Sequence, residues 1–288
     1  MILLKRIYGI LIYSNVFIAF CALALVLANQ LTVEGSMHLN ANSLFVFFST
    51  LFTYSYLKFR AADAGKEETE HGLWYKSNEQ LSKNILLISL LCTVALFFML
   101  STTVMMVVVV LALVTALYGF SPIPFTQPQR QLRDFGLLKT LFVALVWSVS
   151  TVVVPLADTG LDTEMMVFLL LRRFLFVLAL TMVFEIKDLK HDEASNLQTL
   201  PMRIGVSNTK LLAQLILFAL MVVNLLQYFF FSISLENMIA VNLSLLITVF
   251  CIQPLKEETP PLWYFATIDG MMILQFILVY IAVKFFEA

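Results

Sequence analysis

Long apolar segments dominate this chain and restrict its fold more than any other feature of the sequence. Each is close to the ~20 residues that cross the hydrocarbon core of a bilayer as an α-helix. The chain is 60% hydrophobic and 13% charged, whereas a soluble domain carries roughly twice that charged fraction. We therefore predict an all-α membrane protein with nine transmembrane helices. The predicted helices are 7–28, 41–60, 82–100, 103–119, 137–156, 164–186, 208–231, 236–253 and 263–286.

One boundary between these segments is weak. Only Ser101, Thr102 and Thr103 separate the third from the fourth, so a fused pair with eight helices is the alternative. No Pro-, Gly- or Ser-rich linker divides the chain, which predicts that residues 1–288 form a single transmembrane domain. The first segment is followed by no small-residue cleavage site, so we expect it to be retained as a helix.

Basic residues are distributed unevenly among the loops of the nine-helix interpretation. Fifteen of the 18 lysines and arginines fall on the side of the N-terminus, and the loops of the other side hold none. Cytoplasmic loops carry an excess of Lys and Arg, so we expect a multi-pass protein with its N-terminus in the cytoplasm. Because the sequence shows no targeting features, we expect the membrane to be the bacterial cytoplasmic (inner) membrane. Fusing the third and fourth segments would move later basic loops to the wrong side. The fifteen are Lys5, Arg6, Lys58, Arg60, Lys66, Lys76, Lys83, Arg130, Arg133, Lys139, Lys187, Lys190, Arg203, Lys210 and Lys256.

The most informative polar stretch is 184–205, FEIKDLKHDEASNLQTLPMRIG. Glu185, Asp188 and Asp192 follow an i, i+3, i+7 spacing, which places them on one face of a helix. Carboxylates four residues apart lie about 6 Å apart between Cβ atoms and repel each other. Such a pair of carboxylates is stabilised when both bind a divalent cation, and that cation can also bind a diphosphate. The alternative is a solvated helix end with mixed charges.

The residues after these acids predict a break and a new helix. Pro201 suits the first turn of a helix, where its missing N–H costs little. Gly205 allows a bend or a close backbone approach, and Arg203 is placed where it could face a phosphate.

This stretch resembles the second aspartate motif of the UbiA-type intramembrane prenyltransferases. The matching pattern is Asp188-x-x-x-Asp192, a polar spacer, then Thr199-Leu200-Pro201-x-x-x-Gly205. The resemblance implies nine helices around a cavity that opens to the cytoplasm, covered by the two most polar loops. Leu117-Tyr118-Gly119 at the end of the fourth segment and Lys139 at the start of the fifth are weaker similarities.

The first aspartate motif of that family is degenerate here. Its N-D-x-x-D-x-x-x-D pattern falls on residues 55–63, SYLKFRAAD. Asp63 is the only acid kept, because Tyr56 and Phe59 replace the two leading aspartates and Ser55 replaces the asparagine. Losing two carboxylates from a two-metal site should weaken at least one of the metal sites severely.

By this resemblance the chain is a Mg²⁺-dependent enzyme that transfers a prenyl group from an isoprenyl diphosphate to a hydrophobic aromatic or lipid acceptor within the membrane. Asp188 and Asp192 would bind metal and serve catalysis, with Glu185 and Asp63 assisting. The expected substrate-binding residues are Lys58, Arg60, Arg203, Tyr54, Tyr118 and Lys139. Lys58 and Arg60 could compensate for the lost acids by touching the diphosphate directly, although positive-inside anchoring explains them as well.

Two other functions remain open. A catalytically degenerate relative that binds a lipid or polyprenyl ligand without transfer is favoured by the lost first motif. A transporter is the third possibility, but the sequence shows no internal repeat or paired broken helices to support it. The net charge of −1 gives no reason to expect nucleic acid as a partner.

Three charged residues lie inside predicted membrane helices and away from the helix ends, which makes them functional candidates. Arg172 and Arg173 lie in the sixth segment, and Arg173 is about 22 Å along the axis from Asp188. We therefore do not expect Arg173 and Asp188 to contact the same diphosphate. Asp269 in the ninth segment is a candidate partner for the arginines or a group at the cavity mouth.

Overall fold

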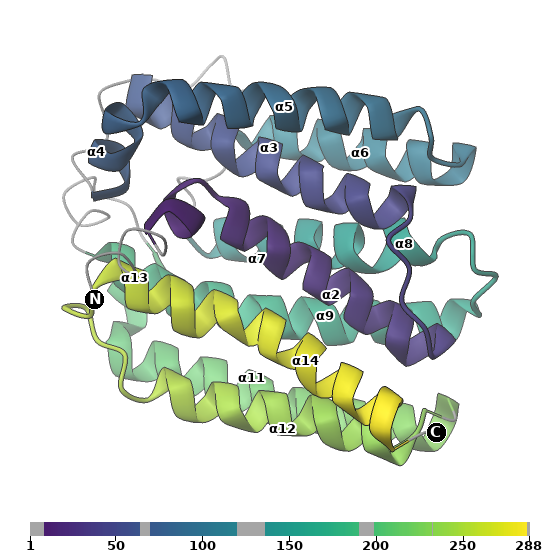
Figure 1. The fold of residues 1–288 in the computed structure, drawn as a ribbon. Helices are drawn as coiled ribbons and strands as arrows, with labels where there is room; N and C mark the ends of the chain where they lie inside the picture. The colour runs from purple at the N-terminus through teal and green to yellow at the C-terminus, as the bar shows by residue number, and fades with distance from the viewer. Residues whose placement is uncertain (1–8, 64–69, 120–135, 190–198, 232, 287–288) are drawn as a thin grey trace.

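The computed structural model describes residues 9–63, 70–119, 136–189, 199–231 and 233–286. All regular secondary structure in these ranges is helical, as the sequence predicts. Figure 1 shows the long helices running along one common direction. The elements are α2 (Val16–Glu34), α3 (Ala41–Asp63), α4 (Glu70–Ser77), α5 (Glu79–Phe97), α6 (Thr102–Gly119), α7 (Gly136–Ser148), the π-helical η2 (Val149–Val153), α8 (Val154–Leu156), α9 (Thr163–Phe184), the 3₁₀ turn η3 (Glu185–Asp188), α11 (Leu200–Phe231), α12 (Leu235–Ile252), α13 (Pro261–Tyr264), the π-helical η4 (Phe265–Asp269) and α14 (Gly270–Phe285).

Seven helical stretches in the described ranges are long and apolar enough to cross a membrane. Each of the nine predicted segments overlaps a helix in the described ranges, but two of these helices do not meet that standard. Ser, Thr, Tyr and basic residues lower the hydropathy of α3, and the apolar stretch of α6, Thr102–Ala116, is shorter. The structure thus confirms that the regular structure of the described ranges is all-helical, with several membrane-type spans, while the number nine stays a prediction.

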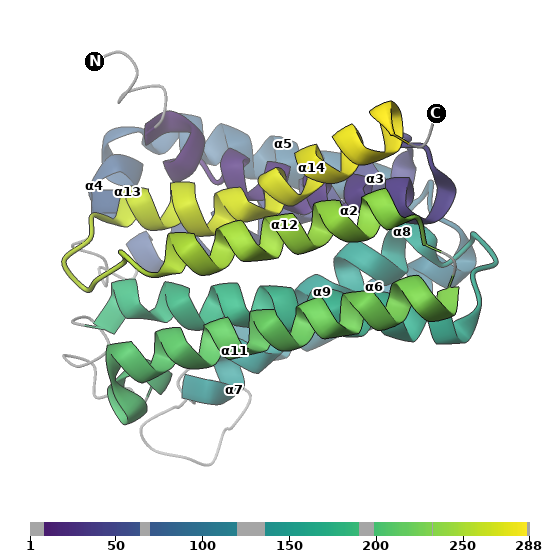
Figure 2. The same cartoon turned by 90° about the horizontal axis from the view of Figure 1, so that it is seen from below.

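Packing contacts arrange the long helices around a central space. α3 packs on α2, α2 on α14, α14 on α12, α12 on α11, α11 on α9 and α9 on α7. α8 continues α7 and contacts α3, which closes the ring. Figure 2 shows α12 lying between α14 and α11. We call the end at which α3 and α9 finish and α11 and α13 begin the motif end, because residues 184–189 and 199–205 lie there; it is on the left in Figure 1.

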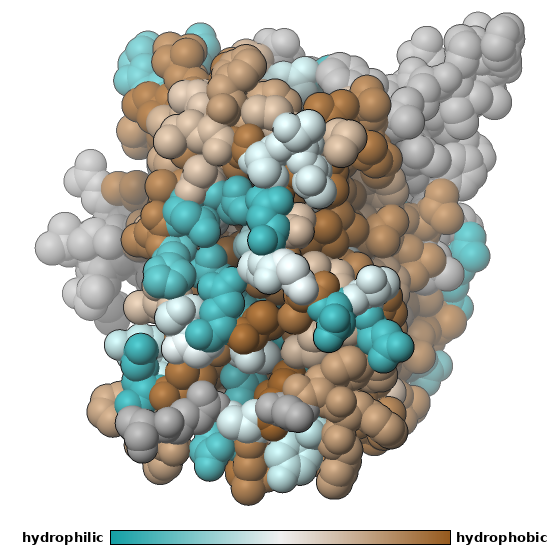
Figure 3. All heavy atoms as spheres, turned by 90° about the vertical axis from the view of Figure 1, so that its right-hand side faces the viewer, coloured by the Kyte–Doolittle hydropathy of each residue, from teal (hydrophilic) through white to brown (hydrophobic). Residues whose placement is uncertain are grey.

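The sides of the bundle expose apolar side chains. Leu91, Leu215 and Phe250 are 60%, 55% and 66% exposed, respectively. Such an apolar surface is unfavourable in contact with water and favourable in contact with lipid tails. Figure 3 looks onto the end opposite the motif end and shows hydrophilic side chains gathered there, flanked by hydrophobic ones. This distribution is that of an integral membrane protein.

The first predicted helix, 7–28, is wrong as a continuous segment. Residues 9–13 are helical, Ser14 and Asn15 form a turn, and α2 begins at Val16. Asn15 has φ 63° and ψ 6°, and among the described residues no other residue except glycine has a positive φ. Asparagine enters this left-handed region more easily than most residues. The break turns Asn15 toward the interior, where its Nδ2 donates to Ser55 Oγ at 3.4 Å.

Gly205 produces the bend that the sequence predicts near the start of α11. Its φ of 82° and ψ of 159° interrupt the helical backbone after a first turn that contains Pro201. Residues with a side chain rarely adopt this conformation, at a cost of about 1–3 kcal/mol.

Gly205→Ala is therefore expected to lower the free energy of unfolding by about 1–3 kcal/mol. A Cβ at Gly205 would meet nothing within 4 Å, so backbone strain is the cause. Thermal unfolding in detergent measures the effect. Gly270→Ala is the matched control, because Gly270 has a helical φ of −59° and its Cβ would only touch Phe17 Cζ at 4.0 Å. Equal loss of stability in both variants would contradict this account.

Candidate active site

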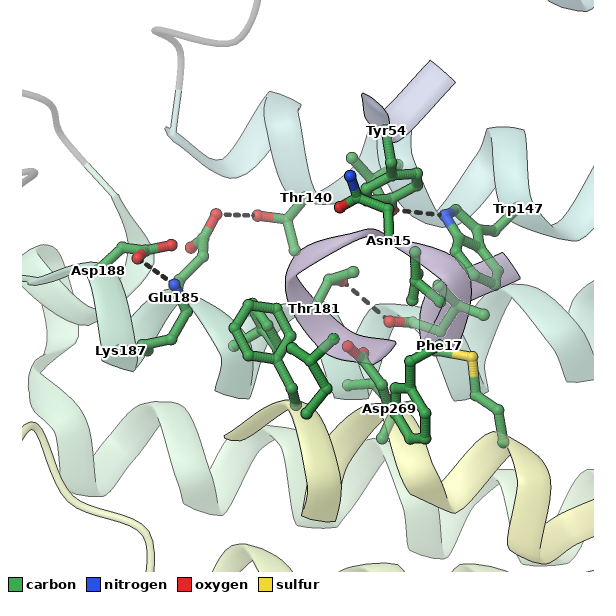
Figure 4. Close-up of a pocket in the computed structure, with 18 of the residues that line it drawn as sticks. Asn15, Phe17, Tyr54, Thr140, Trp147, Thr181, Glu185, Lys187, Asp188 and Asp269 are labelled. Atoms are coloured by element: carbon green, nitrogen blue, oxygen red, sulfur yellow. Dashed lines mark hydrogen bonds and ion pairs between the residues drawn. The ribbon is translucent and has the colours of Figure 1, made fainter. Parts of the chain in front are cut away.

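A cavity of about 250 Å³ lies inside the ring of helices toward the motif end. Seven elements contribute to it: α2, α3, α7, α9, η3, η4 and α14, with the short helical turn before α2. Figure 4 shows several of the polar lining residues, among them Thr140, Thr181 and Asp269, around the same space. The full lining is Ile12, Asn15, Phe17, Ile18, Tyr54, Lys58, Lys139, Thr140, Val143, Trp147, Val177, Leu180, Thr181, Phe184, Glu185, Lys187, Asp188, Phe265, Asp269 and Met272.

Two carboxylates reach the cavity from the 3₁₀ turn η3. A 3₁₀ turn repeats every three residues, so Glu185 and Asp188 project from the same side. Glu185 is 5% exposed, and its Oε1 accepts a 2.6 Å hydrogen bond from Thr140 Oγ1. Asp188 is more accessible and forms an ion pair with Lys187. A buried, oriented carboxylate and an accessible one therefore lie at the cavity together.

Three lysines line the same cavity from three elements: Lys58 from α3, Lys139 from α7 and Lys187 from η3. The Lys187 ammonium lies 5.1 Å from the ring centroid of Phe184 and 5.5 Å from that of Phe265. A cation at such a distance is attracted to the face of an aromatic ring. The polar end of the cavity therefore combines carboxylates, which suit a divalent cation, with ammonium groups, which suit a phosphate.

The rest of the lining is apolar and aromatic. Trp147 Nε1 donates to Tyr54 Oη at 3.1 Å, which satisfies the indole and holds both rings in place. Phe184 and Phe265 meet edge to face with their ring centroids 5.1 Å apart. The arrangement could hold a molecule with an anionic head at the charged end and an apolar tail in the interior.

The UbiA prenyltransferase family model matches residues 77–278, well over half of the chain. The chain belongs to the UbiA prenyltransferase family. The match begins after the degenerate stretch 55–63 and includes the second aspartate motif. No curated protein matches the sequence.

Solved structures of UbiA homologues share the fold. One from Archaeoglobus fulgidus, bound to GPP and Mg²⁺, has a TM-score of 0.63 at 13% identity, covering 95% of this chain and 99% of that one. A structure described for digeranylgeranylglyceryl phosphate synthase has a TM-score of 0.60 at 13% identity, with coverage of 95% and 99%. An apo homologue from Aeropyrum pernix K1 has a TM-score of 0.56 at 12% identity, covering 94% of each chain. At these identities the likeness concerns the fold alone.

The structure brings half of the ten predicted site residues to the cavity. Arg60 and Arg203 are exposed and do not line it. Asp192 lies outside the described residues, as do the side chains of Asp63 and Tyr118. The five at the cavity are Tyr54, Lys58, Lys139, Glu185 and Asp188.

Several lining residues were not predicted as site residues. Lys187 stands outside the i, i+3, i+7 pattern of the acids, and that pattern assumes α-helical geometry, which ends at Phe184. The sequence does contain a feature that could have pointed to Asn15, because the polar pair Ser14-Asn15 interrupts an apolar segment. Thr140 follows the predicted Lys139 directly and is buried against Glu185.

The described residues contain no group of three or more His, Cys, Asp or Glu side chains placed to hold a metal ion. Two carboxylates, Glu185 and Asp188, do line the cavity together. Mg²⁺ is usually bound by one or two carboxylates plus substrate phosphates, so this pair fits the ion without a third protein acid.

Arg172 and Arg173 are buried but bind amides rather than acids. Arg172 donates to Gln227 Oε1 at 3.1 Å, and Arg173 donates to Gln275 Oε1 at 2.9 Å. Asn29 Oδ1 accepts from both guanidinium groups, at 3.5 Å from Arg172 and 2.9 Å from Arg173. Neither arginine lines the cavity.

Asp269, a candidate partner of these arginines from the sequence, does not pair with them in the described part of the chain. Asp269 is 7% exposed and lines the cavity instead, which agrees with the alternative expectation that it belongs to the cavity.

Proposed function

We propose that the protein transfers a prenyl group from an isoprenyl diphosphate to a hydrophobic acceptor within the membrane. The observation that carries this proposal is one cavity with carboxylates and lysines at the motif end and an apolar, aromatic interior. Family membership and the homologue from Archaeoglobus fulgidus bound to GPP and Mg²⁺ support it.

Glu185 and Asp188 are the described residues that would hold Mg²⁺, with Asp192 and Asp63 as further candidates from the sequence. When bound, the ion supplies positive charge that stabilises a diphosphate leaving group. Thr140 orients the Glu185 carboxylate through its 2.6 Å hydrogen bond. Lys187 holds Asp188 at the cavity in the absence of substrate and can turn to a phosphate oxygen when one arrives.

The lysines at the cavity supply charge that the degenerate first motif lacks. Lys58 belongs to that motif, at a position between Tyr56 and Phe59. An ammonium group can neutralise part of the charge that develops on the departing diphosphate. We propose that Lys58, Lys139 and Lys187 bind the diphosphate and so reduce the dependence on a first metal site.

Lys139→Met is expected to weaken the binding of geranyl thiolodiphosphate, an unreactive donor analogue, by about tenfold or more. Lys139 makes no hydrogen bond or ion pair with the described residues, so the loss reflects the ligand and not a broken internal contact. Calorimetric titration measures the affinity. Lys284→Met, an exposed change at the end of α14, should leave it unchanged. An unchanged affinity in Lys139→Met would remove Lys139 from the site.

The aromatic interior serves the second requirement of prenyl transfer. Breaking the allylic C–O bond leaves positive charge on the prenyl chain, which water would capture. Aromatic faces such as those of Phe184 and Phe265 stabilise positive charge, and an apolar lining excludes water. Tyr54 and Trp147 close another part of this lining.

The direct test is product analysis with the purified protein, a panel of prenyl diphosphates of different length, and aromatic and glycerophosphate acceptors, with and without Mg²⁺. If mass spectrometry detects a prenylated acceptor with Mg²⁺ and not without it, the result supports prenyl transfer. Tight donor binding without any product would instead support a relative that binds polyprenyl ligands without transfer.

We also propose that residues 1–288 act as a single transmembrane domain and that the N-terminus and the cavity mouth face the cytoplasm of a bacterial inner membrane. The distribution of basic residues supports this orientation. Reporter fusions at the two termini test it.

A further inference from the structure

Asp269 is an acidic side chain at the cavity that the roles described above do not use. It ends the π-helical segment η4, inside the apolar stretch Pro261–Phe285. Its side chain is buried and belongs to the cavity lining (Figure 4). Segments of π-helix inside α-helices are frequent at functional sites, because they re-aim the side chains of one turn.

The carboxyl group of Asp269 receives no hydrogen bond from the described residues. Cys21 Sγ, at 3.3 Å, contacts its backbone carbonyl and not its side chain. Arg173, the buried cation that was considered as a partner, binds Gln275 instead. A buried polar group without a donor costs free energy, so its presence at a cavity points to a partner supplied by a ligand.

Two further polar groups of the same lining also present hydrogen-bond acceptors. Asn15 uses Nδ2 for Ser55, and no described donor reaches its Oδ1. Thr181 Oγ1 donates its proton to Val177 O at 2.9 Å, which leaves the oxygen able to accept. All three groups line the cavity whose other polar residues include three lysines. The lysines suit an anion, whereas the acceptor groups of Asp269, Asn15 and Thr181 suit a neutral group that donates a hydrogen bond.

We propose that the prenyl acceptor is a neutral hydroxyl compound and that Asp269 binds and deprotonates its hydroxyl group. This inference rests on the proposed function. In the transfer step, an electron pair of the hydroxyl oxygen forms the new C–O bond to the prenyl carbon. The old C–O bond breaks, and its electron pair leaves with the diphosphate. The hydroxyl proton passes to the Asp269 carboxylate, so Asp269 is a catalytic residue that touches the acceptor.

A titration tests the hydroxyl site without any turnover. The probes are 4-propylphenol and its methyl ether, 4-propylanisole, which have similar shapes but differ in the hydroxyl proton. The wild type is expected to bind the phenol about tenfold more tightly than the ether. Asp269→Leu should reduce this preference to less than twofold. Asp162→Asn, an exposed change at the opposite end of α9, should keep it. A preference that persists in Asp269→Leu would overturn the proposal.

Asp269→Asn tests the proton transfer. Its amide oxygen still accepts a hydrogen bond but takes up no proton, so the phenol should bind within about threefold of wild type. With geranyl diphosphate as donor and 4-propylphenol as acceptor, product formation should fall about 100-fold or more, while binding of geranyl thiolodiphosphate is retained. Wild-type turnover in Asp269→Asn would overturn the base role. Absence of product in the wild type would count against the transfer function itself, and the titration would still decide the hydroxyl site. Circular dichroism and thermal unfolding confirm that both variants fold.

Discussion

Replacing Asp188 and Asp192 together by alanine is expected to abolish the Mg²⁺-dependent part of donor binding and to reduce turnover by about 1000-fold or more. Asp188 lines the cavity in the turn that also carries Glu185. Removing the acids leaves the lysines without the metal that would share the diphosphate charge. The measurements are the affinity for geranyl thiolodiphosphate with Mg²⁺ or with EDTA, and product formation from geranyl diphosphate.

A matched control for this variant is Asp158→Asn. Asp158 lies at the opposite end of the bundle, where Oδ1 accepts a 2.9 Å hydrogen bond from Ser101 Oγ, a bond that an asparagine oxygen can still accept. It should leave both donor affinity and turnover unchanged. If the double alanine variant kept the response to Mg²⁺, Asp188 and Asp192 would not be the metal ligands and the catalytic proposal would lose its basis.

Asn29→Leu is expected to lower the free energy of unfolding by about 3 kcal/mol or more, because two buried guanidinium groups lose a shared acceptor. Asn29 Oδ1 accepts from Arg172 and Arg173, and neither arginine has a carboxylate partner among the described residues. Asn29 Nδ2 also donates to Thr151 O at 2.8 Å. The usual α-helical donor to that carbonyl would be residue 155, a proline, which has no N–H.

Thermal unfolding in detergent measures this effect, and two further variants isolate its cause. Asn84→Leu makes the same chemical change at an exposed site on α5 and should be close to neutral. Asn29→Asp keeps the acceptors and adds a negative charge beside the guanidinium groups, so it should stay within about 1 kcal/mol of wild type, since it loses one neutral hydrogen bond. A large loss in Asn29→Asp, equal to that in Asn29→Leu, would show that the Thr151 contact dominates and not the arginines.

Local sequence patterns predicted a large part of the fold and some of the site. Apolar segments of membrane length predicted the helices, because a backbone in lipid must satisfy its own hydrogen bonds. The spacing of Glu185 and Asp188 predicted that they act together, and both line the cavity. The Pro201 and Gly205 pair predicted a new helix with a bend, which α11 shows.

Other features depended on distant contacts and so were missed or misplaced. The turn at Asn15 makes a contact with Ser55, a residue of another helix 40 positions away. Lys187 lines the cavity from the 3₁₀ turn η3, which replaces α-helical geometry after Phe184. Arg203 and Arg60 have the right chemistry for a phosphate, but their helices present them to the outside.

Composition and spacing along the chain alone determined that this protein is helical, belongs in a membrane and carries an acidic motif at a helix end. These properties follow from local rules, since hydropathy and helical period act over one or two turns. Only the tertiary structure decided which groups share the cavity, that Asp269 faces it, and that Arg172 and Arg173 are held by amides. The reason is that the face a helix turns inward is set by the packing of several helices at once, and that packing joins residues far apart in the sequence.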